Sequence, residues 1–453
     1  MFAIPGLVGI LFLVYIRPQE FIPILGRVPW IYIGLLLAAI GCALDVRRGF
    51  ARLQSNPLLP WAGAYFGWAF VTLAVKAPWD ILSEMLGSMV SLCLFLMVAG
   101  SLQTLRSLRI MATVLLCLSL SITLVGVHQA FAPLGCVKQS DDPTSDQLVP
   151  DGRSCEERED CYEGNLEAGV EYRCEHIGLA GTTSVLHRVR YRGIMQDPNE
   201  LAVIVSIGVP FAIALLEMRK TLPRALLVAF SVAATGLCTI FTQSRSGQLA
   251  FMAVLGVYFL RRWKALGLVL AALVAGPVMM LGGRSGDSAD ESTMSRYEAW
   301  DVAFELARQS PIFGMGKGQF TEFHERTAHN SMMLALGELG LVGLFFWSAV
   351  VYFAFKVPMT LLSGRSNAPP LVRLWATALL SAMCGLMVSS MFLSFSDHNI
   401  FWIYLGLVGA LYAGARELMP DFRVASTAKD LLAVVAIDGV LLVFLKAYLR
   451  TKV

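Results

Sequence analysis

The chain has 453 residues, of which 56% are hydrophobic and 15% are charged, and its formal net charge is +3. Its mean hydropathy of +0.63 excludes an ordinary soluble domain. Apolar runs of about 15 to 22 residues recur along nearly the whole length, which is typical of polytopic helical membrane proteins. We therefore predict an all-α integral membrane protein.

The apolar runs predict twelve transmembrane helices. The first run has no charged residue before it and no small-residue cleavage site, so we interpret it as a retained span. The predicted spans are 1–16, 28–44, 58–75, 85–100, 108–130, 199–216, 223–242, 247–260, 264–281, 330–355, 372–395 and 399–415. Residues 430–448 are an apolar run with Asp438 near the middle, and both a thirteenth span and a helix along the cytoplasmic face remain open.

Basic residues collect in every second connection between these runs. The positive-inside rule assigns such connections to the cytoplasm, with the amino terminus on the same side. They contain Arg47, Arg48, Arg52, Arg106, Arg109, Arg219, Lys220, Arg224, Arg261, Arg262, Lys264, Lys356, Arg365, Arg373, Arg416, Arg423 and Lys429. Two long polar loops, 131–198 and 282–329, are then expected on the outer face.

This pattern divides the chain into four predicted parts. Residues 1–130 hold the first five spans, 131–198 form an outer loop, 199–420 form a core that includes the loop 282–329, and 421–453 carry the last helix. The first outer loop contains four cysteines, and two disulfides are the expected state in an oxidising compartment. The candidates are Cys136, Cys155, Cys161 and Cys174. Three pairings remain open, and zinc is a second interpretation.

The unusual polar residues lie on the predicted outer face. His324 and His329 are five residues apart, which rotates them about 140° from one another on a helix, so a zinc-protease site is not expected. Arg245 lies in a short outer turn between two spans, where an arginine is costly unless it meets an anion. Together with Arg296, it supplies groups that can hold a diphosphate, while His329 can accept a proton from a hydroxyl.

Several of these segments also have plain structural interpretations. Asp197 before Pro198 is a good helix N-cap, and "GMGKG" is better read as a glycine turn than as a phosphate loop. His398 beside Asp397 fits an interface pair. We nevertheless include four outer-face polar residues as candidate substrate-binding groups. They are Arg192, Asn199, Asn330 and His398.

The segments "DPNELA", "SRSG", "RYEAWDVAFELARQSPIFGMGKGQF" and "AHNSMMLALGELGLVG" resemble the O-antigen ligase and O-antigen polymerase superfamily of bacterial envelope enzymes. The resemblance covers residues 190–410 in outline. The family's histidine followed by ten residues and a glycine is met by His329 and Gly340. Its Arg-x-x-x-Leu element is met by Arg296, but Trp300 stands in place of the leucine.

The resemblance implies an inner-membrane enzyme that transfers glycan from undecaprenyl diphosphate to a sugar hydroxyl at the periplasmic face, without a metal or another cofactor. His329 would be the general base, and Arg245 and Arg296 would hold the diphosphate. The acceptor would be lipid A-core for a ligase, or a second lipid-linked repeat unit for a polymerase. Membrane lipids are expected around the protein, no nucleic acid is expected as a partner, and a chain-length regulator remains open.

Two other function classes compete with glycosyl transfer. A transporter or flippase of lipid-linked glycan would share the many spans, but transporters usually place polar sites near the bilayer midplane, where the main charged residues here are Glu338 and Asp438. A membrane metalloprotease would need two correctly spaced ligands, which the histidines do not provide. The sequence does not separate ligase from polymerase, or define the polysaccharide or the oligomeric state.

Overall fold

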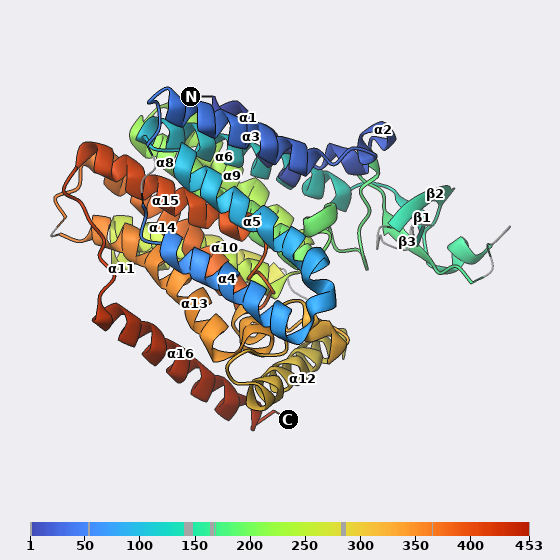
Figure 1. Cartoon of the computed structure of the whole chain (residues 1–453). Coiled ribbons are helices and arrows are strands. Elements are labelled where there is room, and N and C mark those ends of the chain that lie inside the picture. The colour runs from blue at the N-terminus through green and yellow to red at the C-terminus, as the bar shows by residue number, and fades with distance from the viewer. Residues whose placement is uncertain are drawn as a thin grey trace. The chain divides into compact units, whose positions relative to one another are not determined.

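The computed structural model describes residues 2–52, 55–139, 148–163, 167, 169–281, 287–364 and 366–452. The predicted basic residue Arg365 and the first part of the predicted loop 282–329, residues 282–286, lie outside these ranges. The structure is mostly helical, as the composition predicts (Figure 1). It divides into two compact units, the first made of residues 1–10, 32–111 and 285–453, and the second of residues 11–31 and 112–284.

Among the described residues, eight helical stretches are long and apolar enough to cross a membrane, which supports an all-α membrane protein. They are Trp30–Arg47, Pro78–Ser101, Leu105–Ala130, Pro198–Met218, Leu222–Phe241, Ser331–Leu362, Pro370–Ser390 and Ala428–Leu449. Two shorter apolar helices are Ala3–Tyr15 and Ala265–Leu281.

The first unit contains most of the helices that matter for the site. They are α4 (Leu59–Lys76), α5 (Ile81–Ser101), α12 (Asp287–Gln309), α13 (Ser331–Leu362), α14 (Pro370–Ser390), α15 (Asn399–Leu418) and α16 (Ala428–Leu449). Helix α15 is the centre of this unit, because every side chain from Ile400 to Ala415 is buried. Its Trp402 packs on Phe66 with ring centroids 4.5 Å apart, and α5 and α14 flank it.

The second unit is arranged around α7. Its helices are α2 (Pro23–Gly26), α7 (Pro198–Ser206), α8 (Val209–Met218), α9 (Leu222–Phe241), α10 (Arg245–Trp263) and α11 (Ala265–Leu281). Three further helices run through both units: α1 (Ala3–Tyr15), α3 (Trp30–Arg47) and α6 (Leu105–Ala130). The predicted N-cap of α7 is confirmed, since the Asp197 side chain accepts a hydrogen bond from the Asn199 N–H.

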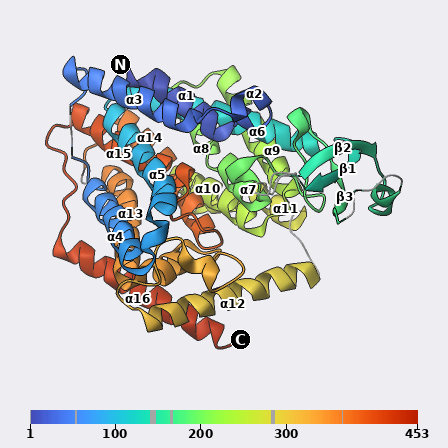
Figure 2. The same cartoon turned by 45° about the vertical axis from the view of Figure 1, so that its right-hand side comes forward.

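The observed helices differ from the predicted apolar runs in two places. The predicted run 199–216 is divided into α7 and α8, which are separated by a turn at Ile207 and Gly208. The predicted loop 282–329 contains the 23-residue helix α12, whose many polar residues hide it from a search for apolar runs. In both views α12 lies next to α13, and α16 runs beside α13 (Figure 2).

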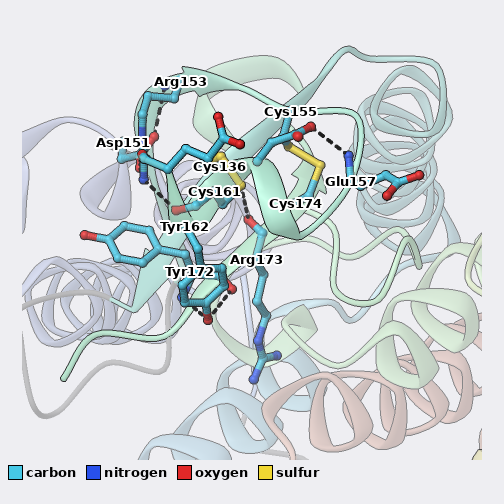
Figure 3. The surroundings of a disulfide bond; sticks show 12 residues. Cys136, Asp151, Arg153, Cys155, Glu157, Cys161, Tyr162, Tyr172, Arg173 and Cys174 are labelled. Carbon is cyan, nitrogen blue, oxygen red and sulfur yellow. Dashed lines mark hydrogen bonds and ion pairs between the residues drawn. A yellow bond between two sulfur atoms is a disulfide. The ribbon is translucent and has the colours of Figure 1, made fainter. Parts of the chain in front are cut away.

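The four-cysteine loop folds as a small antiparallel sheet in the second unit. Its strands are β1 (Leu134–Gln139), β2 (Leu148–Ser154) and β3 (Tyr172–His176), in the order β2-β1-β3. Figure 3 shows the two disulfides, which join Cys136 to Cys161 and Cys155 to Cys174. All four cysteine sulfurs are therefore used in covalent links. Cross-links of this kind stabilise a small unit that has little apolar core of its own.

Candidate functional site

His329 directly precedes α13 and has an unusual backbone conformation. Its φ is +46°, in the left-handed region that few residues other than glycine adopt. The carbonyl of the preceding residue, Ala328, accepts a hydrogen bond of 2.9 Å from the indole N–H of Trp300. Ala328 is fully buried, whereas the His329 side chain is half-buried. The backbone is thus held on the amino-terminal side of His329 while the ring stays accessible.

The residue after His329 holds the backbone on the other side. Asn330 is buried, and its side-chain oxygen accepts hydrogen bonds from the N–H groups of Met332 and Met333 at 2.9 and 3.1 Å. Its amide nitrogen donates to the carbonyl of Met391 at 3.1 Å. The predicted substrate-binding residue Asn330 is therefore the N-cap of α13 and joins it to the end of α14.

Arg296 lies one helical turn before Trp300, on the same face of α12. Its side chain is half-buried, and Trp300 is buried. Helix α12 thus carries both the candidate arginine and the side chain that fixes the backbone beside His329. This contact gives a physical reason for the tryptophan, because a leucine at this position would have no N–H to donate to Ala328.

Helix α13 is interrupted one third of the way along. Gly340 has φ +67° and ψ −169°, a combination that is essentially restricted to glycine. A Cβ atom at this position would lie 2.3 Å from the carbonyl oxygen of Ile312. The glycine eleven positions after His329 is therefore required by a backbone break against a neighbouring segment.

The segment 311–318 fills this break. The N–H groups of Met315 and Gly316 donate to the carbonyls of Gly337 and Glu338 at 3.0 and 2.9 Å. Carbonyls released by a break in a membrane helix must find such partners, because hydrocarbon supplies none. The "GMGKG" sequence is confirmed as a glycine turn, since its glycines at 314, 316 and 318 all have positive φ.

Lys317, in the middle of this turn, forms a buried charge cluster. Its ammonium nitrogen lies 3.0 Å from a carboxylate oxygen of Glu338 and 2.7 Å from one of Asp397. The lysine and Glu338 side chains are 9% and 6% exposed, and that of Asp397 is 23% exposed. Burial opposes the charged form of Lys317, but the two carboxylates raise its pKa well above the usual value.

This cluster was not predicted from the sequence. The available signals were a lysine between glycines in an outer loop and Glu338 inside an apolar run, 21 residues later. Because Asp397 directly precedes His398, the N-cap of α15, the cluster connects the outer loop, the break in α13 and the start of α15. Asp397 also accepts a hydrogen bond from the Tyr65 hydroxyl at 3.4 Å.

His398 and His324 both have local backbone contacts. His398 is the N-cap of α15, with Nδ1 accepting from the Ile400 N–H at 3.3 Å, and its ring lies 4.5 Å from that of Phe395. His324 Nδ1 accepts from the Arg326 N–H at 3.1 Å in its own turn. His324 and His329 therefore sit in different local structures, one in a loop turn and the other at a helix start.

The remaining candidates belong to the second unit. Arg245 is the first residue of α10, and its side chain is exposed. The preceding residue, Ser244, caps α10 and donates a hydrogen bond of 2.7 Å to the side chain of Asn199. Asn199 is buried and connects the turn that carries Arg245 to the start of α7. Arg192 donates to the backbone carbonyl of Glu20 at 2.9 Å.

The structure therefore groups the predicted residues within two units. Arg296, His329, Asn330 and His398 lie in the first unit, and Arg192, Asn199 and Arg245 lie in the second. Within the first unit, the contact between Trp300 and Ala328 joins the helix of Arg296 to the backbone of His329.

The apolar helices of membrane-spanning length indicate a multi-pass membrane protein. Residues 229–348, well under half of the chain, match the family model described as O-Antigen ligase. The match supports the O-antigen ligase and polymerase superfamily and, in general terms, a glycosyltransferase type of function. It includes Arg245, Arg296 and His329, and it ends before His398. No curated protein matches the chain.

Proposed function

We propose that this protein transfers glycan from undecaprenyl diphosphate to a sugar hydroxyl at the periplasmic face of the bacterial inner membrane. The observation that carries the proposal is His329, held with positive φ between two anchored residues beside the helix of Arg296. The match to the O-antigen ligase family over this region supports it. The acceptor is lipid A-core or a second lipid-linked repeat unit.

The proposed chemistry is one displacement at the anomeric carbon. His329 takes the proton of the acceptor hydroxyl as its oxygen forms the new glycosidic bond. The bond from the anomeric carbon to the diphosphate oxygen breaks, and the polyprenyl diphosphate leaves with an additional negative charge. Arg296 stabilises that charge, because guanidinium groups form paired hydrogen bonds with phosphate oxygens. For Arg245, in the second unit, the same role is proposed from the family resemblance alone. Asn330 supports His329 as the N-cap of α13. Asn199 supports Arg245 by accepting a hydrogen bond from Ser244, the N-cap of α10.

The proposed topology has twelve spans from a cytoplasmic amino terminus, with α16 as a thirteenth. Helix α16 runs antiparallel to α13, because Asp430 pairs with Lys356 at 2.7 Å and the Asp438 side chain accepts from Ser348 at 2.7 Å. Because α16 lies alongside α13 in this way, α16 crosses the membrane if α13 does. The basic end of α16 is then on the outer side of the membrane. There the Lys446 ammonium nitrogen lies 2.6 Å from a carboxylate oxygen of Asp301 in α12.

A transporter of lipid-linked glycan is the second candidate. Transporters use interrupted helices, and α13 is interrupted next to the buried pair of Lys317 and Glu338. In this protein, however, the segment 311–318 fills the break with backbone hydrogen bonds. A filled break of this kind favours a rigid scaffold for the start of α13 over a transport path.

The direct test uses purified protein in liposomes with an undecaprenyl-diphosphate-linked repeat unit, with and without lipid A-core, in the presence of EDTA. A ladder of lipid-linked glycan without core identifies a polymerase, and product formed only on core identifies a ligase. If the glycan is not transferred in either tube and instead crosses the bilayer, the proposal is wrong and the transporter replaces it.

Replacing Trp300 with phenylalanine is expected to lower kcat about 3- to 10-fold with little change in KM, because one hydrogen bond beside His329 is lost while the ring remains. The matched control is Trp375→Phe in α14, since the buried Trp375 indole N–H has no hydrogen-bond partner among the described residues. Equal kcat values for the Trp300 variant and the unmodified protein would contradict this role.

A further inference from the structure

The last helix, α16, lies outside the region that matches the ligase family, yet it contacts both helices that flank the candidate site. The matched region ends at residue 348, whereas α16 covers Ala428–Leu449. Helix α12 carries Arg296, and α13 begins just after His329. In both views the end of α16 lies beside α12, and its length runs beside α13 (Figure 1 and Figure 2).

Polar contacts fix the position of α16 along α13. Near the start of α16, the Asp430 carboxylate lies 2.7 Å from the Lys356 ammonium nitrogen and accepts a hydrogen bond of 2.9 Å from the Tyr352 hydroxyl. Near its middle, Asp438 accepts a hydrogen bond of 2.7 Å from Ser348. The three partners lie on successive turns of one face of α13. Helix α16 therefore cannot slide along α13 without breaking these contacts.

The other end of α16 is bonded to one face of α12. The Tyr448 hydroxyl lies 2.8 Å from that of Tyr297, and the two rings pack edge to face with centroids 5.6 Å apart. One turn further along α12, a carboxylate oxygen of Asp301 lies 2.6 Å from the Lys446 ammonium nitrogen. The same nitrogen lies 5.1 Å from the ring centroid of Phe304. Because residues 297, 301 and 304 share a face of α12, these contacts fix the rotation of that helix.

Tyr297 connects this end of α16 to the backbone beside His329. Its ring packs edge to face against that of Trp300, with centroids 5.8 Å apart. The Trp300 indole N–H donates to the carbonyl of the residue before His329 at 2.9 Å. A continuous series of side-chain contacts therefore runs from Tyr448 in α16, through α12, to the peptide that precedes the candidate base.

Helix α16 adds little to the core of the first unit. Only 11% of its membrane-spanning window is buried inside the protein. Its polar side chains are nevertheless specifically placed, since Asp430 and Asp438 bond to α13, whereas Lys446 and Tyr448 bond to α12. Polar groups in an apolar helix are costly unless they are used. This distribution fits a helix that holds α12 against α13 better than one that fills a core.

We propose that α16 positions the candidate base and that Tyr448 is a positioning residue of the site. Tyr448 acts through Tyr297 and Trp300 on the backbone of His329. The inference rests on the proposed function, because the position of His329 affects the rate only if this residue takes the proton of the acceptor. Small displacements of a catalytic group lower the rate strongly, so a contact made far from the substrate can matter for kcat.

Two substitutions of Tyr448 test its contribution to the rate. Tyr448→Phe removes one hydroxyl and keeps the ring, so kcat is expected to fall about 3-fold. Tyr448→Ala also removes the ring contact, so kcat is expected to fall about 10-fold. KM for donor and acceptor should stay within about twofold, because Tyr448 acts through other residues. Tyr32→Phe is the matched control, since Tyr32 is an exposed tyrosine of α3. Unchanged kcat in Tyr448→Ala would overturn the proposal.

A pair of double variants separates positioning from general stabilisation. If Tyr448 acts through the hydrogen bond of Trp300, adding Tyr448→Phe to Trp300→Phe should cause no further loss of kcat. Adding it to Trp375→Phe should still cause the loss of about 3-fold, because Trp375 lies in α14 and outside this series of contacts. Losses that multiply equally in both backgrounds would mean that Tyr448 only stabilises the fold, and the proposal would be wrong.

Hydrogen–deuterium exchange of the full-length protein separates this inference from the function on which it rests. Tyr448→Ala should raise amide exchange in peptides that cover residues 326–334 and leave exchange in α14 unchanged. This result, without glycan transfer by the unmodified protein, would keep the positioning contact and reject the transferase. Normal transfer by Tyr448→Ala, with unchanged exchange at residues 326–334, would keep the transferase and reject the positioning role.

Discussion

His329→Ala and Arg296→Ala are each expected to abolish glycan transfer while the protein remains inserted at normal levels. The loss of a general base lowers a rate by about 10²- to 10⁴-fold, and the loss of one preorganised group at a developing negative charge lowers it by about 10²- to 10³-fold. The measurement is initial rate in liposomes at saturating donor and acceptor, with the amount of protein quantified in the same membranes.

Matched controls are available in the loop between α12 and α13. His324→Ala removes a histidine whose Nδ1 is bound within its own turn, and Arg326→Ala removes an exposed arginine. Both variants are expected to keep transfer within about twofold of the unmodified protein, as for surface substitutions away from a site. If His329→Ala retained the rate of His324→Ala, His329 would not be the base.

The helices of this protein follow from its sequence because each apolar run is long and local. The structure places α9 at Leu222–Phe241 where the run 223–242 predicts it, and α14 and α15 also overlap their runs. Helix α12 was missed for a physical reason: its polar residues are typical of a helix outside the apolar layer, and hydropathy alone does not detect such a helix.

The candidate site was only partly predictable. His329 and Arg296 could be singled out by residue type, by their place in the predicted outer loop 282–329 and by the resemblance. The contacts that support these two residues could not be predicted from the sequence. The hydrogen bond from Trp300 to Ala328 spans 28 residues, and Lys317 and Asp397 are 80 residues apart in the chain. Contacts of this range depend on how the helices pack, and no local pattern encodes them.

The interruption of α13 illustrates the same limit. The sequence predicts one span over 330–355, whereas the helix is broken at Gly340 and the adjacent segment 311–318 bonds to the freed carbonyls. The sequence signal was the pair of glycines around Glu338 inside an apolar run. Its meaning depends on Lys317, which reaches the break from another part of the chain.

Replacing Lys317 with methionine is expected to lower the free energy of unfolding by about 3–5 kcal/mol, because the buried carboxylate of Glu338 and the partly buried carboxylate of Asp397 are left without their cation. The expected observations are a lower melting temperature in detergent and less folded protein in the membrane. Lys220→Met is the matched control, since Lys220 is exposed in the connection between α8 and α9 and its loss should leave the melting temperature unchanged.

A compensated variant distinguishes loss of the cation from loss of packing. Lys317→Met combined with Glu338→Gln and Asp397→Asn removes all three charges with little change in volume, so it should recover most of the stability that Lys317→Met loses. If the combined variant is no more stable than Lys317→Met, the stability comes from the packing of the lysine stem and not from its charge. In the expected case, the cluster holds the break in α13 against the start of α15, and it thereby supports the segment on which His329 is presented.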